Sequence, residues 1–200
     1  MLKKYSIIYA DPPWTFKNKN TGGSLTSGAN AKYSTMSVDD ISKLPINNLS
    51  STDSILYMWW VASQPKEALK VVESWGFEIK TMVGFNWVKT TKNDKLHFGM
   101  GFYSRSGSEA CLIAVKGKPK RINASIRSVL ITDENNDDYF TETIYNKVGI
   151  HSKKPDIIRD RIVDMMGDLP RIELFARNVT DGWDVFGDEV SNSININNYI

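Results

Sequence analysis

The tetrapeptide Asp11-Pro12-Pro13-Trp14, which directly follows the apolar residues 5–10, limits the fold of this chain most strongly. Proline fixes φ at about −65° and has no N–H to donate, so two consecutive prolines end any strand that precedes them. Residues 5–10 therefore predict a short buried strand that runs into a carboxylate and a rigid turn. We expect Asp11 to lie at the carboxyl end of that strand.

Further along the chain, apolar runs alternate with segments of helical spacing. Strands are expected over residues 54–61, 77–89, 110–115, 171–176 and 183–186, and helices over residues 38–42, 65–75 and 155–166. Ser37 and Ser63 are expected to cap the first two helices, and Gly76 to end the second. This alternation indicates an α/β fold with a mostly parallel sheet flanked by helices, and such sheets bind ligands at the carboxyl ends of their strands.

Length and composition favour a single domain over residues 1–190, followed by a polar, frayed tail over residues 191–200. The chain has 200 residues, of which 41% are hydrophobic, and this is enough for one core. We find neither a signal peptide nor a run of the roughly 18 apolar residues that a membrane span needs. We therefore expect a cytoplasmic protein without membrane contact. With Cys111 as its single cysteine, the chain has no disulfide framework, and no metal site is expected.

The net charge of +2 says little about a nucleic-acid partner, because dedicated binders usually have a clear basic bias. The aromatic content is more informative, since the chain has six Trp and eight Tyr. Several of these rings lie in polar company, where a ring can stack on a base. The polar segments 15–33 and 90–107 are the regions expected to contact a nucleic-acid strand.

Asp-Pro-Pro-Trp suits the methylation of an amino group on a planar base. Such an amine is a poor nucleophile, because its lone pair is conjugated into the ring. The Asp11 carboxylate and the Pro12 carbonyl, held rigid by Pro13, can accept its two N–H bonds while Trp14 stacks on the base. An isolated Asp-Pro-Pro is more often a simple turn, and even the full motif discriminates poorly between adenine and cytosine.

Motifs along most of the chain resemble the MT-A-seventy family of adenine-N6 methyltransferases. This family includes compact bacterial and phage proteins and the catalytic subunit of the messenger-RNA adenosine methyltransferase. Besides Asp11 to Trp14, the resemblance rests on residues 33–37, 56–61, 75–77, 87–90, 115–117, 154–156 and 172–177. It implies a Rossmann-like methyltransferase fold whose catalytic strand precedes the cofactor strand. That order explains why no Gly-rich nucleotide loop follows the first strand.

The resemblance implies S-adenosylmethionine as the cofactor, with S-adenosylhomocysteine as its product. Asp11, Pro12, Pro13 and Trp14 are the implied catalytic residues. Asp11 is also expected near the amino group of the cofactor and Lys154 near its carboxylate, whereas Arg177 reaches the ribose. Further cofactor contacts are expected from Glu173, Asn178, Asp188 and Glu189. For Lys154, Asp188 and Glu189, an ordinary solvated side chain is the alternative interpretation.

The predicted function is N6-methylation of adenine in DNA. Substrate contacts are expected from Trp14, Lys17, Tyr33, Lys89, Tyr103 and Arg105. DNA is favoured over RNA by analogy with compact bacterial and phage relatives. Three alternatives stay open: an RNA adenosine methyltransferase, a cytosine amine methyltransferase, and a non-catalytic nucleic-acid-binding subunit. We expect the enzyme to recognise a short or relaxed target sequence. Alternatively, a partner protein provides the sequence specificity, or the chain forms a homodimer.

Overall fold

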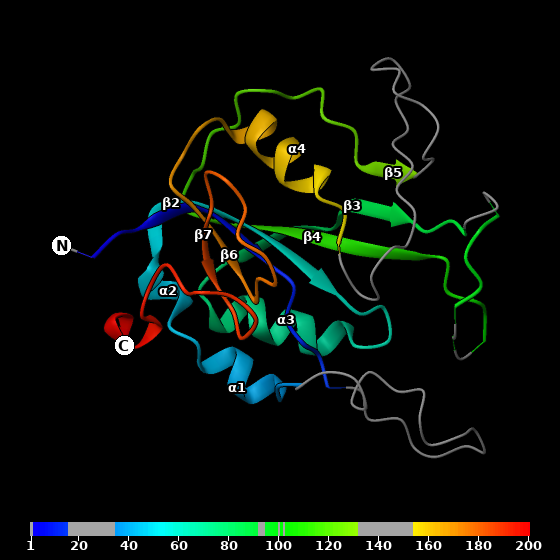
Figure 1. The fold of residues 1–200 in the computed structure, drawn as a ribbon, viewed down its shortest axis with the longest axis horizontal. Coiled ribbons are helices and arrows are strands. Elements are labelled where there is room, and N and C mark those ends of the chain that lie inside the picture. The colour runs from blue at the N-terminus through cyan, green and yellow to red at the C-terminus, as the bar shows by residue number, and fades with distance from the viewer. Residues whose placement is uncertain (1, 16–34, 92–94, 100, 102, 132–153) are drawn as a thin grey trace.

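The computed structural model describes residues 2–15, 35–91, 95–99, 101, 103–131 and 154–200 (Figure 1). Within these ranges seven strands form one sheet in the order β5-β3-β4-β2-β1-β6-β7. The strands are β1 (Tyr5–Ala10), β2 (Ser50–Trp60), β3 (Glu78–Val88), β4 (Ser108–Lys116), β5 (Val129–Ile131), β6 (Arg171–Leu174) and β7 (Asp184–Phe186). The predicted strands are all present, and β5 was not foreseen.

Helices cover both faces of the sheet. They are α1 (Val38–Lys43), α2 (Ile46–Leu49), α3 (Pro65–Ser74), α4 (Ile157–Met166) and the 3-10 helix η2 (Ile196–Tyr199). Figure 1 shows α4 on one face and α1 and α3 on the other. Successive strand residues point to opposite faces, so Ile8 packs in the core cluster that contains Ile41 of α1, and Ile7 in the cluster that contains Ile158 of α4. The predicted α/β architecture is confirmed.

Strand directions place the site. β1 is parallel to β2 and β6, and β6 is parallel to β7, so the carboxyl ends of these strands share one edge. β4 runs antiparallel between β2 and β3, a direction that the apolar run 110–115 did not predict. Because Trp60 at the end of β2 pairs with Ala110, the beginning of β4 also lies at this edge.

Of the two predicted helix caps, the structure confirms the one at α1 and contradicts the one at α3. Ser37 caps α1, since its hydroxyl accepts the backbone N–H of Asp40 at 3.1 Å. Ser63 does not cap α3, because the cap position is Gln64 and Pro65 begins the helix. Proline at the first helical position has a preset φ and no N–H that needs a partner, so a side-chain cap is less necessary there.

The C-terminal residues pack against the domain, so the expectation of a frayed tail over residues 191–200 is wrong. Tyr199 is buried, its hydroxyl donates to the Lys3 carbonyl at 2.8 Å, and its own carbonyl accepts from the Asn48 amide at 2.8 Å. The Asn-rich composition hid the few apolar side chains that anchor this segment. Among the described residues, we find no helix with the length and apolarity needed to cross a membrane.

Candidate active site

Asp11 follows β1 directly and begins a tight turn. The Pro12 carbonyl accepts the N–H of Trp14 at 2.9 Å, and the Pro13 carbonyl accepts the N–H of Met36 at 2.9 Å. A hydrogen bond between residues two apart closes a three-residue turn, so the proline pair lies in a tight turn directly after β1. A carbonyl oxygen has two lone pairs, so the Pro12 oxygen keeps one acceptor position after bonding Trp14.

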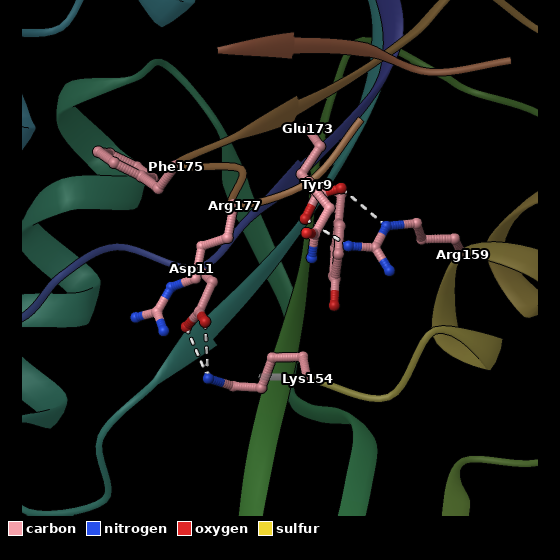
Figure 2. A pocket seen from close by; sticks show the side chains of 8 residues that line it. Tyr9, Asp11, Lys154, Arg159, Glu173, Phe175 and Arg177 are labelled. Atoms are coloured by element: carbon pink, nitrogen blue, oxygen red, sulfur yellow. Dashed lines mark hydrogen bonds and ion pairs between the residues drawn. The ribbon is translucent and has the colours of Figure 1, made fainter. Parts of the chain in front are cut away.

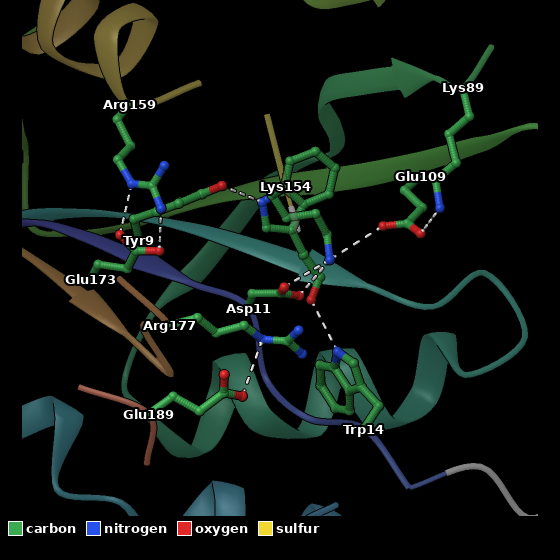
Figure 3. A network of polar contacts seen from close by, with 11 residues as sticks. Tyr9, Asp11, Trp14, Lys89, Glu109, Lys154, Arg159, Glu173, Arg177 and Glu189 are labelled. Carbon is green, nitrogen blue, oxygen red and sulfur yellow. Dashed lines mark hydrogen bonds and ion pairs between the residues drawn. The ribbon is translucent and has the colours of Figure 1, made fainter. Parts of the chain in front are cut away.

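Lys154 bridges two carboxylates at this edge of the sheet (Figure 3). Its ammonium donates to both oxygens of Asp11 at 2.8 Å each and lies 3.3 Å from Oε2 of Glu109. Lys89, directly after β3, donates to Oε1 of Glu109. Four charged groups of alternating sign therefore run in a row across the site, from Lys89 through Glu109 and Lys154 to Asp11.

The charges in this row support one another. Burial alone would lower the pKa of the Lys154 ammonium, but Asp11 and Glu109 outweigh it and raise that pKa above its ordinary value. Burial alone would raise the pKa of the Glu109 carboxyl, but Lys154 and Lys89 bring that pKa below its ordinary value. At neutral pH Lys154 is therefore charged and Glu109 is ionised.

Arg159 and Glu173 form a second ion pair near the first. Arg159 of α4 donates through Nε and Nη2 to the two oxygens of Glu173 on β6, at 2.7 Å each, and through Nη1 to Asp156 at 2.8 Å. Its guanidinium carbon lies 5.6 Å from the ring centre of Tyr9. Arg159 and Glu173 are both only 6% exposed. Glu173, expected to contact the cofactor, thus has both oxygens engaged by Arg159.

A pocket opens between these two ion pairs (Figure 2). It is lined by Tyr9, Asp11, Lys154, Arg159, Glu173, Phe175, Arg177 and Asn178. These residues come from β1 and its end, from α4 and the segment before it, and from β6 and the turn after it. The structure therefore brings five predicted cofactor residues to one place: Asp11, Lys154, Glu173, Arg177 and Asn178.

The turn after β6 has an unusual backbone. Phe175 has φ of 60°, in the left-handed region, where a residue other than glycine is strained by about 1–3 kcal/mol. Ala176 then contacts the end of β7, since a Cβ added to Gly187 would lie 2.2 Å from the Ala176 carbonyl oxygen. Glycine at 187 lets the two strand ends approach this closely, and this contact supports the turn that leads to Arg177.

The other predicted site residues lie at different distances from the pocket. Glu189 is connected to the pocket by Arg177, because Nε of Arg177 lies 3.7 Å from Oε1 of Glu189. Asp188 is exposed and does not line the pocket. Tyr103 and Arg105 are exposed on the segment between β3 and β4, where the Arg105 guanidinium lies 4.8 Å from the ring centre of Phe98. Two further predicted substrate contacts, Lys17 and Tyr33, lie outside the described residues.

Trp14 is more buried than base stacking requires. The side chain is 6% exposed, packs within the core, and donates its ring N–H to the Trp59 carbonyl at 3.1 Å. In this structure Trp14 therefore does not present an open ring face, and its visible role is to anchor the turn that begins at Asp11.

Two site residues were missed in the sequence. Glu109 precedes the apolar run of β4, and only the antiparallel direction of that strand brings it beside Lys154. Arg159 had a usable signal, because it shares the buried face of α4 with Ile162 and Met166 at helical spacing. A charged residue on an apolar face predicts a buried partner. Within the described ranges, no three or more His, Cys, Asp or Glu side chains are grouped to hold a metal ion.

Comparison with known proteins identifies the family of this chain. Type II methyltransferase M.MunI of Mycoplasma sp is 35% identical over 204 residues, which cover 94% of this chain and 78% of that protein. The human N(6)-adenosine-methyltransferase catalytic subunit METTL3 is 27% identical, over 95% of this chain but only 29% of its own length. The mouse N(6)-adenine-specific methyltransferase METTL4 is 29% identical, over 94% of this chain and 38% of its own length. The MT-A70 family model matches residues 5–189, and the chain belongs to this family.

Proposed function

We propose that this protein is an S-adenosylmethionine-dependent methyltransferase that acts on the 6-amino group of adenine in DNA, in the cytoplasm. The observation that carries the proposal is the Asp11–Lys154 ion pair at the carboxyl edge of β1, in a chain of the MT-A70 family. A catalytically silent member would have little reason to keep an acceptor, a cation and a pocket together at this edge.

The donor set of the pocket fits the proposed cofactor. The amino-acid part of S-adenosylmethionine carries an ammonium and a carboxylate, and Asp11 and Lys154 are a carboxylate and an ammonium side by side. A zwitterion can take the place of this internal pair, with Lys154 holding its carboxylate and Asp11 facing its ammonium. Arg177 and Asn178 line the same pocket and offer donors to ribose hydroxyls. When bound, the cofactor supplies an electrophilic methyl group on a sulfonium sulfur.

The chain's own residues then prepare the amine. Asp11 and the free lone pair of the Pro12 carbonyl can accept the two N–H bonds, which holds the nitrogen in a geometry that frees its lone pair from the ring. The Pro12 carbonyl is fixed by the turn to Trp14 before the base arrives, so this acceptor needs little reorganisation at the moment of transfer. As the nitrogen gains the methyl group and positive charge develops on it, the Asp11 carboxylate stabilises that charge and can take up the proton that the nitrogen then loses.

The choice of adenine in DNA is supported by the relatives. METTL3 and METTL4 carry adenosine or adenine N6 in their names, and M.MunI, the relative covered over most of its length, is named a type II methyltransferase. Lys89 is connected to the pocket residue Lys154 by Glu109, which contacts both lysines. In the segment that follows Lys89, Phe98 and Tyr103 offer exposed rings and Arg105 offers a positive charge. Stacking on Trp14 remains part of the proposal, and it requires the ring to become uncovered when a base enters.

The test is methylation of three nucleic acids by the purified chain. Single-stranded DNA, duplex DNA and RNA are each incubated with cofactor labelled in its methyl group, and the products are digested to nucleosides. We expect labelled N6-methyladenine from DNA. Label in RNA alone would move the assignment to an RNA adenosine methyltransferase, and label in cytosine would overturn the choice of base.

Variants of Asp11 test the catalytic role separately. We expect Asp11→Ala to abolish transfer while cofactor binding, followed by calorimetry, is weakened but measurable; Asp11→Asn keeps the size of the side chain and should also lose transfer. The matched control is Asp164→Asn, an exposed aspartate on α4 outside the pocket, which should retain activity. Normal turnover in the Asp11 variants would contradict the assignment.

A further inference from the structure

Arg159 is a buried cation that the proposed chemistry does not use. All three of its guanidinium nitrogens donate hydrogen bonds, two to Glu173 and one to Asp156. It packs over Tyr9, the residue two before Asp11, and the Tyr9 hydroxyl accepts the ring N–H of Trp59 at 2.7 Å. A buried arginine with every nitrogen engaged is fixed in position, so the elements that it joins are fixed relative to one another.

The two elements joined by Arg159 and Glu173 carry the two ends of the pocket. Arg159 lies in the first turn of α4, five residues after Lys154, and Asp156 lies between them. Glu173 lies on β6, four residues before Arg177. In Figure 3 the Arg159–Glu173 pair lies on one side of the site, and Lys154, just before α4, and Arg177, just after β6, lie beside Asp11.

We infer that Arg159 is a positioning residue for cofactor binding, because its fork to Glu173 sets the separation of Lys154 from Arg177. This inference rests on the proposed function, in which Lys154 holds the carboxylate of S-adenosylmethionine and Arg177 its ribose. In this role Glu173 acts through Arg159, which is why both of its oxygens face the guanidinium although the side chain lines the pocket.

The geometry requires arginine specifically. A bidentate contact fixes direction as well as distance, and lysine, with a compact ammonium, cannot reproduce two parallel bonds and a third to Asp156. Arg159→Lys therefore keeps the buried charge but loses the orientation of the first turn of α4. If Arg159 served stability alone, Arg159→Lys would leave cofactor binding unchanged, because the lysine still balances the charge of Glu173.

The test compares stability with cofactor affinity in four variants. Arg159→Lys and Arg159→Met should raise the Kd of S-adenosylmethionine, measured by calorimetry, by about 10–100-fold, the range found for residues that orient a binding group. The KM for DNA and the kcat at saturating cofactor should stay near wild type. The double variant R159M/E173M removes both charges, so its stability should recover while its affinity stays low. Arg161→Met is the control, because Arg161 lies on α4 but donates to the carbonyls of Arg127 and Val129.

Hydrogen exchange gives a readout without cofactor. In Arg159→Lys, the backbone amides of residues 157–160 should exchange faster than in wild type, while those of β1 should not. Wild-type affinity in folded Arg159→Lys, or affinity that recovers together with stability in the double variant, would overturn the inference. A wild-type protein that binds cofactor but transfers no methyl group refutes the proposed function and leaves the inference standing. If the wild type binds no cofactor at all, both are refuted, and the exchange data then show whether Arg159 orders α4.

Discussion

Lys154→Met is the substitution whose effect the structure specifies in most detail. It keeps the length and apolar stem of the side chain and removes the ammonium that lies between Asp11 and Glu109. Glu109 keeps Lys89 as a partner, whereas Asp11 loses its two 2.8 Å hydrogen bonds at once. The variant thus places a partly buried carboxylate next to an apolar side chain.

The expected cost lies between two known limits. Breaking a fully buried ion pair costs about 3–5 kcal/mol, and breaking an exposed one costs about 0–1 kcal/mol. The side chain of Lys154 is 11% exposed and that of Asp11 24%, so the site lies nearer the buried limit. We expect a loss of about 3 kcal/mol, which for a domain of this size lowers Tm by about 6–12 °C.

The effect should depend on pH with a defined sign. The pKa of Lys154 is raised in the folded state, so its contribution is fully present below its ordinary value of 10.5 and is lost as pH rises through the folded pKa. The pKa of Glu109 is lowered, so its contribution is present above its ordinary value of 4.5 and is lost as pH falls through the folded pKa. The difference between wild type and Lys154→Met should be constant between these values and shrink on both sides.

Urea unfolding at a series of pH values measures this difference. Lys80→Met is the matched control, because Lys80 lies 2.5 Å from Glu78 but both side chains are well exposed, and its effect should stay below about 1 kcal/mol. Equal losses in the two variants would refute the reasoning, since burial would then make no difference. A loss in Lys154→Met that does not change at either end of the pH range would show that charge is not its cause.

Three further results are expected. Gly187→Ala should lower stability by about 1–3 kcal/mol in thermal unfolding, because its Cβ meets the backbone of Ala176; an unchanged Tm would show that the strand ends can separate. The Cys111 thiol is buried, and burial raises its pKa, so a colorimetric thiol reagent should label it only after unfolding, and rapid labelling of the native protein would contradict this burial. The double variant F98A/R105A should raise the KM for DNA and reduce its salt dependence while the Kd of the cofactor is unchanged; an unaltered KM removes these side chains from the interface.

The position of Asp11 was predictable because local rules determine it. An apolar segment followed by two prolines can end a strand only there, and the helical spacing of residues 155–166 defined α4 in the same way. These local rules do not predict strand direction. A buried apolar run has the same pattern in a parallel and in an antiparallel strand, so the position of Glu109 beside Lys154 could not be predicted. The row of charges from Lys89 to Asp11 was therefore not predicted either.

Side-chain burial was the second limit. Trp14 follows the motif in the sequence, and a tryptophan beside a catalytic carboxylate suggested a wall for the base. Its actual position depends on the Trp59 carbonyl of β2, 45 residues away, which only the assembled sheet brings close. The Arg159–Glu173 pair is a similar case, because its partners come from α4 and β6 and meet through long-range packing.

The reversal of β4 also has an evolutionary consequence. Because β3 and β4 are antiparallel neighbours, the segment between them is a hairpin connection at the same edge as Asp11. Connections of this kind tolerate changes of length and composition better than the strands they join. One reversed strand therefore places a connection that can vary in length and composition beside Asp11, where the substrate contacts are proposed.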